Sequence, residues 1–231
     1  MRNMKKIFIL SCSSNQLGNR FQAAAYFLAT AFELKAIPFM AWSAGYEKIL
    51  GKSRFSSVLI KWIANFLESN SWLKKILRVS VVDGTRKPVG LTNNSTRLII
   101  SSSYIVIVKG YYIYTHPEYL DKYAMRIVKY LNVGVPRNVR DFAESKTRQK
   151  GVTTVGIHIR HGDYARYRKG RYFYPISHYE SVAKSLVGNS EGFRLKFIVC
   201  SDTDIPDTAF SELDWEKGPG SILGDLYVLS R

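Results

Sequence analysis

Two apolar segments, each followed by polar side chains, most constrain the fold of this chain. Residues 153–159 are rich in β-branched side chains and almost uncharged, and residues 195–200 form a second such run. Between them, Ser177 and Glu180 predict a capping box, and a helical pattern follows in Val182, Ala183, Leu186 and Val187. Strand, helix and strand in this order predict a right-handed βαβ unit with parallel strands. We expect the first strand to be buried on both faces.

Both predicted strands end in residues that can bind a ligand. The first ends in residues 158–163, His-Ile-Arg-His-Gly-Asp, and the second is followed by Ser201 and Asp202. Parallel strands joined by a crossover end at the same edge of a sheet, where ligands bind in open α/β folds. His158, Arg160 and Asp202 are therefore expected to line one crevice. An arginine there can hold two phosphate oxygens at once.

The first half of the chain predicts a second α/β domain. Residues 6–11 form a strand pattern, residues 13–18 a loop, and a helical apolar stripe follows in Phe21, Ala24, Ala25, Leu28 and Phe32. A loop before a helix presents backbone N–H groups to an anion or a polar sugar. Gly18 alone is also compatible with an ordinary tight turn between strand and helix.

Three segments together carry a family resemblance. Residues 158–164, the Ser201-Asp202 pair and residues 16–20, Gln-Leu-Gly-Asn-Arg, resemble the α-1,2-fucosyltransferases and the wider GDP-fucose-dependent fucosyltransferase superfamily, in the same order and rough spacing. The resemblance implies a GT-B-like α/β fold of two Rossmann-like domains with mostly parallel sheets. It also implies GDP-fucose as donor, a glycan acceptor, an α-1,2 linkage formed with inversion, and no required metal or cofactor.

The resemblance also assigns roles to individual residues. Arg160 matches the arginine that binds the donor β-phosphate, and Asn19 matches an asparagine that faces donor and acceptor. His158 and Asp202 match the contacts to the base and ribose. The predicted substrate-binding residues are therefore Gly18, Asn19, His158, Arg160, Gly162, Ser201 and Asp202. The predicted catalytic residues are Arg160 and Asp163, where Asp163 is a candidate general base and equally a candidate for capping the loop or orienting Arg160.

Two features depart from the family pattern. His161 stands where the family commonly has a second arginine, so a guaranteed positive charge is replaced by a group that is largely neutral at pH 7. The family continues past the helix expected in residues 221–231 with a further strand and a Ser-rich donor loop, whereas this sequence ends at Arg231. The resemblance therefore implies an incomplete second domain. It leaves an inactive, truncated fucosyltransferase as an alternative.

Residues 134–151 are polar and basic and include Pro136, which predicts a linker between the domains. We place an α/β acceptor-side domain in residues 1–145 and a partial α/β GDP-sugar-binding domain in residues 146–231. The hydrophobic content of 46% is sufficient for two modest cores.

The formal net charge of +16 predicts attraction to polyanions. It also supports an alternative of another class, a non-catalytic basic protein that binds nucleic acid or another polyanion. Residues 164–174 interleave arginine, lysine and tyrosine, a pattern found in single-strand binders, in loops near a nucleotide donor and in solvated loops. Because no nucleic-acid motif accompanies it, nucleic acid is the disfavoured partner.

Residues 61–78 combine lysines with tryptophan, phenylalanine and aliphatic side chains. Such a basic amphipathic helix can lie on an anionic membrane or bury its apolar face in its own domain. Most amphipathic helices bury their apolar face, so the sequence favours burial in the domain and keeps contact with an anionic membrane as the second option.

The remaining patterns concern metals and location. The four histidines and two cysteines form no spaced metal set. Cys12 and Cys200 end strands in different halves, which favours free thiols and a reducing compartment. No run reaches the roughly 18 to 20 apolar residues of a membrane span. We therefore expect a cytoplasmic protein, with contact at the inner face of the cell membrane as the further option.

Overall fold

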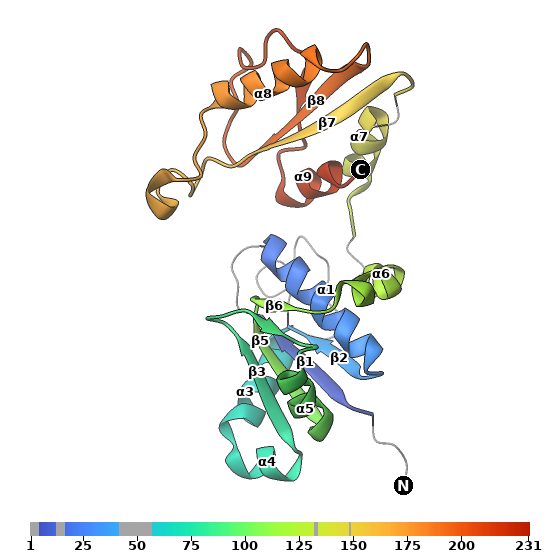
Figure 1. Cartoon of the computed structure of the whole chain (residues 1–231), viewed down its shortest axis with the longest axis vertical. Coiled ribbons are helices and arrows are strands. Elements are labelled where there is room, and N and C mark those ends of the chain that lie inside the picture. The colour runs from blue at the N-terminus through green and yellow to red at the C-terminus, as the bar shows by residue number, and fades with distance from the viewer. Residues whose placement is uncertain (1–4, 13–16, 42–56, 132–133, 148) are drawn as a thin grey trace. The chain divides into compact units, whose positions relative to one another are not determined.

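The computed structural model describes residues 5–12, 17–41, 57–131, 134–147 and 149–231 (Figure 1). The chain divides into two compact units, Met1–Gly134 and Val135–Arg231. The boundary expected between residues 145 and 146 falls inside helix α7 (Arg137–Thr147), which belongs to the second unit. Much of the expected linker is therefore a packed helix.

The first unit contains a four-stranded parallel sheet. Its strand order is β2 (Ile37–Met40), β1 (Ile7–Ser11), β5 (Ile105–Gly110) and β3 (Val79–Gly84). Two short strands, β4 (Val89–Gly90) and β6 (Ile113–Tyr114), form a separate parallel pair. The strand expected in residues 6–11 is confirmed.

Alternation along the strands separates two apolar layers in this unit. Phe8 and Leu10 of β1 face the core that contains α1 (Leu17–Glu33) and α6 (Pro117–Leu131), while Ile9 faces the core that contains α3 (Ser57–Ser69). Two further helices are α4 (Ser71–Ile76) and α5 (Asn94–Ser102). In the described part of the chain, no helix is both long and apolar enough to cross a membrane.

The helix expected after β1 is present, and it begins at Leu17. Gly18 and Asn19 consequently lie in the first turn of α1 and not in the preceding loop. Gln16 and the rest of that loop lie outside the described residues.

The second unit contains a three-stranded parallel sheet with the order β7 (Val152–Ile159), β8 (Arg194–Ser201) and β9 (Trp215–Lys217). Helix α8 (Ile176–Gly188) covers one face, and α7 and α9 (Ile222–Leu229) cover the other (Figure 1). A short 3₁₀ turn, η1 (Tyr167–Gly170), lies between β7 and α8. The predicted βαβ unit is confirmed.

Strand β7 is not buried on both faces as its composition predicted. It pairs only with β8 among the described strands, and Ile159 is its only fully buried side chain. A side chain at Gly156 would meet Leu229 of α9, since an added Cβ would lie 2.6 Å from Leu229 Cδ2. An edge position leaves β-branched residues half-exposed, and composition alone does not distinguish an edge strand from a central one.

The predicted capping box is also wrong. The residue at the N-cap of α8 is Pro175, so Ser177 lies inside the helix. The Glu180 carboxylate instead accepts a hydrogen bond from the backbone N–H of Phe210 at 2.8 Å. This contact attaches α8 to the segment that follows β8.

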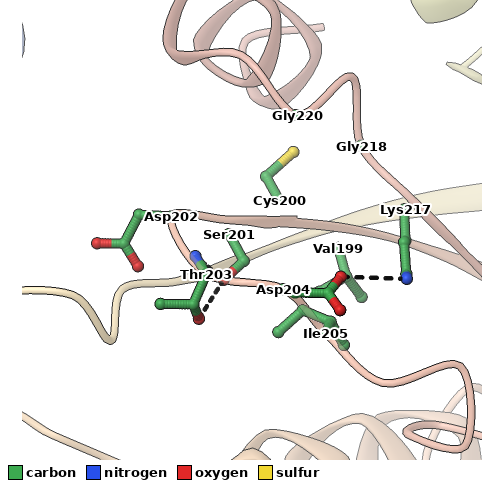
Figure 2. A pocket seen from close by; sticks show the side chains of 10 residues that line it. All are labelled: Val199, Cys200, Ser201, Asp202, Thr203, Asp204, Ile205, Lys217, Gly218 and Gly220. Atoms are coloured by element: carbon green, nitrogen blue, oxygen red, sulfur yellow. Dashed lines mark hydrogen bonds and ion pairs between the residues drawn. The ribbon is translucent and has the colours of Figure 1, made fainter.

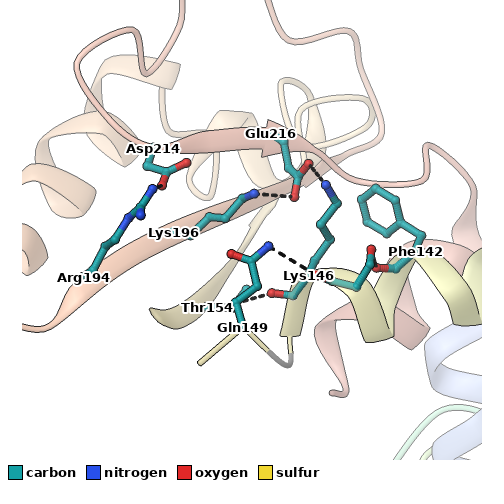
Figure 3. A network of polar contacts seen from close by, with 9 residues as sticks. Phe142, Lys146, Gln149, Thr154, Arg194, Lys196, Asp214 and Glu216 are labelled. Atoms are coloured by element: carbon teal, nitrogen blue, oxygen red, sulfur yellow. Dashed lines mark hydrogen bonds and ion pairs between the residues drawn. The ribbon is translucent and has the colours of Figure 1, made fainter. Parts of the chain in front are cut away.

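A polar network attaches α7 to the sheet (Figure 3). Glu216 of β9 forms ion pairs with Lys146 of α7 at 2.7 Å and with Lys196 of β8 at 3.3 Å. The Thr154 hydroxyl of β7 donates to the carbonyl of Lys146 at 2.7 Å. Helix α7 therefore makes polar bonds to β7 and β9, and its apolar side chains pack against β8.

Candidate functional site

The parallel register of β7 and β8 brings their carboxyl ends together, as predicted. His158 pairs with Cys200, and Ile159 pairs with Ser201. Directly after these strands, the Asp202 carboxylate accepts hydrogen bonds from the backbone N–H groups of His161 at 2.8 Å and of Gly162 at 3.2 Å. Asp202 thus ties the loop after β7 to the end of β8.

Gly162 permits this contact because it lacks a side chain. A Cβ at this position would lie 2.8 Å from Oδ2 of Asp202. Such a distance is far below ordinary carbon–oxygen contact, so any larger residue would force the carboxylate or the loop to move.

Asp163 fixes the orientation of Arg160. The guanidinium donates from Nε to Oδ1 and from Nη2 to Oδ2, both at 2.9 Å, and lies over the Tyr164 ring at 4.6 Å from its centre. These bonds raise the pKa of Arg160 and lower the pKa of Asp163. Two-point contact leaves Nη1 pointing away from Asp163, where its N–H groups can meet an anion. The geometry places Asp163 as the partner that orients Arg160.

His161 also secures this loop. Its Nε2 lies 2.7 Å from the carbonyl oxygen of Tyr174, and its ring packs on Phe173 with centroids 4.5 Å apart. Because a carbonyl only accepts, Nε2 carries the proton and donates. The sequence offered no signal for this anchoring role.

Tyrosine rings gather in the loop that follows. Tyr164, Tyr167 and Tyr172 lie within 6.1 Å of one another by ring centroids, and Arg168 and Arg171 lie over two of these rings. The basic and aromatic side chains of residues 164–174 therefore pack partly on each other.

A pocket of about 330 Å³ opens after β8 (Figure 2). Its walls come from the end of β8, the loop that follows it, and the end of β9, and the lining residues are Val199, Cys200, Ser201, Asp202, Thr203, Asp204, Ile205, Lys217, Gly218 and Gly220. Ser201 and Asp202 were predicted site residues. At the rim, Lys217 pairs with Asp207 at 2.8 Å and with Asp204 at 3.4 Å. The volume is at the lower end of the range for small-molecule sites.

The wall of this pocket includes a buried thiol, Cys200, which lies beside the carboxyl group of Asp225. Sequence analysis identified neither as a site residue. Burial raises the pKa of the Cys200 thiol to about 12, and the neighbouring Asp225 adds to the shift. Burial likewise raises the pKa of Asp225, whose carboxylate accepts from Gly220 N–H at 3.1 Å. A thiol with this pKa is neutral at pH 7, so Cys200 is no nucleophile. Gly218 and Gly220, which precede the N-cap residue Ser221, were the sequence features that could have indicated a turn lining this pocket.

The predicted site residues therefore fall into two groups. Arg160, Gly162, Asp163, Ser201 and Asp202 lie together at one edge of the second sheet, with His158 exposed beside them on β7. Gly18 and Asn19 belong to α1 of the first unit. Among the described residues, no group of three or more His, Cys, Asp and Glu side chains is arranged to hold a metal ion. Metal-independent transfer stays a prediction.

Comparison with known proteins bears on the fold. No family model and no curated protein matches the sequence. Among solved structures, the chain is similar to the NodZ α-1,6-fucosyltransferase soaked with GDP-fucose, with a TM-score of 0.53 and 10% identity over 98% of this chain and 82% of that chain. Two further crystal structures of NodZ from Bradyrhizobium match with TM-scores of 0.52 and 0.51, also at 10% identity. The likeness is one of fold.

This likeness confirms the GT-B-like α/β fold with parallel sheets. It extends over both units of the chain. The similar structures are of an α-1,6 enzyme, so the comparison gives no support to the α-1,2 linkage that the sequence resemblance implied.

Proposed function

We propose that this protein is a fucosyltransferase that moves L-fucose from GDP-fucose to a glycan hydroxyl. The observation that carries the proposal is the position of Arg160 directly after β7. Asp163 holds its guanidinium through two hydrogen bonds, and Asp202 attaches the same loop to the end of β8. The fold likeness to a fucosyltransferase supports the same function.

In the proposed donor complex, the nucleotide occupies the edge of the second sheet. The pocket after β8 takes the nucleoside, and Arg160 holds the β-phosphate through Nη1. An ionised carboxylate has about four acceptor sites, so Asp202 can still bind a base or ribose besides the loop amides. His158 is exposed on β7, pairs with Cys200 of β8, and lies at the same edge of the second sheet.

The proposed reaction is a direct displacement at the anomeric carbon. The acceptor hydroxyl oxygen forms a bond to C1 and releases its proton to the surrounding water. The bond from C1 to the β-phosphate oxygen breaks at the same time, and its electron pair stays on the phosphate. Inversion follows from attack opposite the leaving group. Arg160 stabilises the departing negative charge more strongly in the transition state than in the ground state. Asp163 acts as a positioning residue in this scheme, because its two carboxylate oxygens already accept from Arg160.

Calorimetric titration tests the donor site. We expect wild-type protein to bind GDP-fucose and GDP and to discriminate against ADP-glucose. A charge-assisted hydrogen bond contributes about 1.5–3 kcal/mol, so Arg160→Ala should raise the Kd for GDP-fucose about 10- to 100-fold. Arg166→Ala is the matched control, since Arg166 is an exposed arginine of the same loop. It should leave the Kd unchanged.

The alternatives give different results in the same experiment. A basic polyanion binder would show equal affinity for GDP-fucose and ADP-glucose, and its binding would collapse as salt rises. An inactive, truncated fucosyltransferase would bind GDP-fucose and GDP poorly or not at all. Equal affinities in Arg160→Ala and wild type would contradict the proposed role of Arg160.

A further inference from the structure

Helix α3 is apolar on more faces than its own unit buries. Ile60, Ala64 and Leu67 pack against the sheet, which accounts for one face. Trp62 and Phe66, on another face, remain 62% and 46% exposed, and the exposed face also includes Val58, Leu59 and Ile63. Exposed apolar side chains gathered on a protein surface are typical of a site that contacts another molecule or a membrane.

The exposed apolar surface continues on the next helix. Only Asn70 separates α3 from α4, where Trp72 is 68% and Ile76 54% exposed. On α3 the Trp62 and Phe66 rings stack, with centroids 5.5 Å apart and planes inclined by 8°. We define the α3–α4 surface as the exposed apolar residues of the two helices and of the C-cap of α4, namely Val58, Leu59, Trp62, Ile63, Phe66, Trp72, Ile76 and Leu77.

Cations accompany this surface, and its single acid is already paired. Residues 57–78 contain four cations, Lys61, Lys74, Lys75 and Arg78, and one acid, Glu68. Glu68 forms an ion pair with Lys109 of β5 at 2.9 Å. The α3–α4 surface therefore combines exposed tryptophans with an excess of positive charge.

We propose that the α3–α4 surface docks onto an anionic lipid bilayer. Tryptophan favours the interface between headgroups and acyl chains, and lysines favour anionic headgroups. A second copy of the chain fits this surface less well, since two-fold pairing would place the same cations opposite each other.

Co-sedimentation of residues 1–231 with lipid vesicles tests this proposal and needs no measurement of enzyme activity. Wild-type protein should bind vesicles of phosphatidylcholine that contain about 30 mol% phosphatidylglycerol, an anionic lipid that gives the vesicle a negative surface. It should bind pure phosphatidylcholine at least about tenfold less. Trp62→Ser with Trp72→Ser should lower binding to the anionic vesicles by about tenfold or more. Both tryptophans are exposed, so the fold should stay intact, which circular dichroism checks.

Matched control variants distinguish binding through the α3–α4 surface from non-specific adsorption to vesicles. Leu98→Ser with Phe193→Ser changes two apolar residues that are 70% and 69% exposed elsewhere, and it should bind like wild type. Lys61→Glu with Lys75→Glu should lose binding, whereas Lys87→Glu with Lys129→Glu, an equal charge change at exposed lysines, should retain most of it.

Two outcomes would overturn the proposal. One is vesicle binding that the tryptophan and lysine variants leave unchanged. The other is self-association of wild-type protein that the tryptophan variants abolish, because the α3–α4 surface would then be covered by a second copy.

Discussion

At the scale of single residues, Asp202 and Gly162 form a contact that tolerates no additional atom. Gly162→Ala would place a methyl group 2.8 Å from the Asp202 carboxylate, so either the loop carrying Arg160 shifts or the carboxylate moves and loses its bonds to the loop amides. We expect the Kd for GDP-fucose to rise about tenfold, the equivalent of one charge-assisted hydrogen bond. Calorimetry measures this change.

Gly188→Ala is the control for that substitution. An added Cβ at Gly188 meets nothing within 4 Å, so donor affinity should not change. Wild-type affinity in Gly162→Ala would show that the position of this loop does not matter for the donor.

Asp225 makes stability depend on pH. Burial raises its pKa above 3.8, so the folded protein binds this proton more tightly than the unfolded chain. Its contribution to the free energy of unfolding is therefore largest at low pH, and it is lost as the pH rises from about 4 through the raised pKa. Asp225→Asn keeps an acceptor for Gly220 N–H and cannot ionise. Its melting temperature should exceed that of wild type at pH 7, and the difference should shrink towards pH 4.

Asp121→Asn, at an exposed position of α6, is the control for this titration and should melt like wild type at both pH values. If Asp225→Asn melts below wild type at pH 7, the ionised carboxylate contributes more through its hydrogen bonds than its burial costs.

At the scale of secondary structure elements, α7 decides where the second unit begins. Ala143 is fully buried and Phe142 packs against the same cluster, which includes Ile198 and Cys200 of β8. A fragment of residues 135–231 keeps this helix, whereas a fragment of residues 146–231 exposes that face of β8. We expect the longer fragment to unfold cooperatively on heating and the shorter one to show no cooperative transition. Equal melting curves would contradict the boundary at Gly134.

The sequence predicted these elements unevenly. β-Branched runs identified β1, β7 and β8, and the polar residues after β7 and β8 identified one edge of the second sheet correctly. The polar composition of α7 concealed a helix because only Val139 and Ala143 are fully buried in it. The edge position of β7 depends on which strands pair, and periodicity carries no such information.

At the scale of the whole molecule, the α/β fold with two parallel sheets could be predicted, whereas the wall of the pocket could not. Cys200, Gly218 and Asp225 meet only after β9 and α9 have packed on β8. The glycines at 218 and 220 hinted at a turn, but nothing in the sequence placed that turn beside Cys200. The sequence also identified Arg160 and the lysines of residues 61–78. The structure was needed to show that Asp163 orients Arg160 and that the apolar residues beside those lysines are exposed.

The bonds between Asp202 and the loop after β7 also make the two strand ends thermodynamically dependent on each other. A ligand group that fills the pocket after β8 and holds Asp202 in place reduces the freedom of the loop that carries Arg160. By reciprocity, an anion held by Arg160 must favour binding in that pocket by the same factor. A nucleoside and a diphosphate joined in one molecule should therefore bind more tightly than the two separate fragments predict, with a single carboxylate as the coupling element.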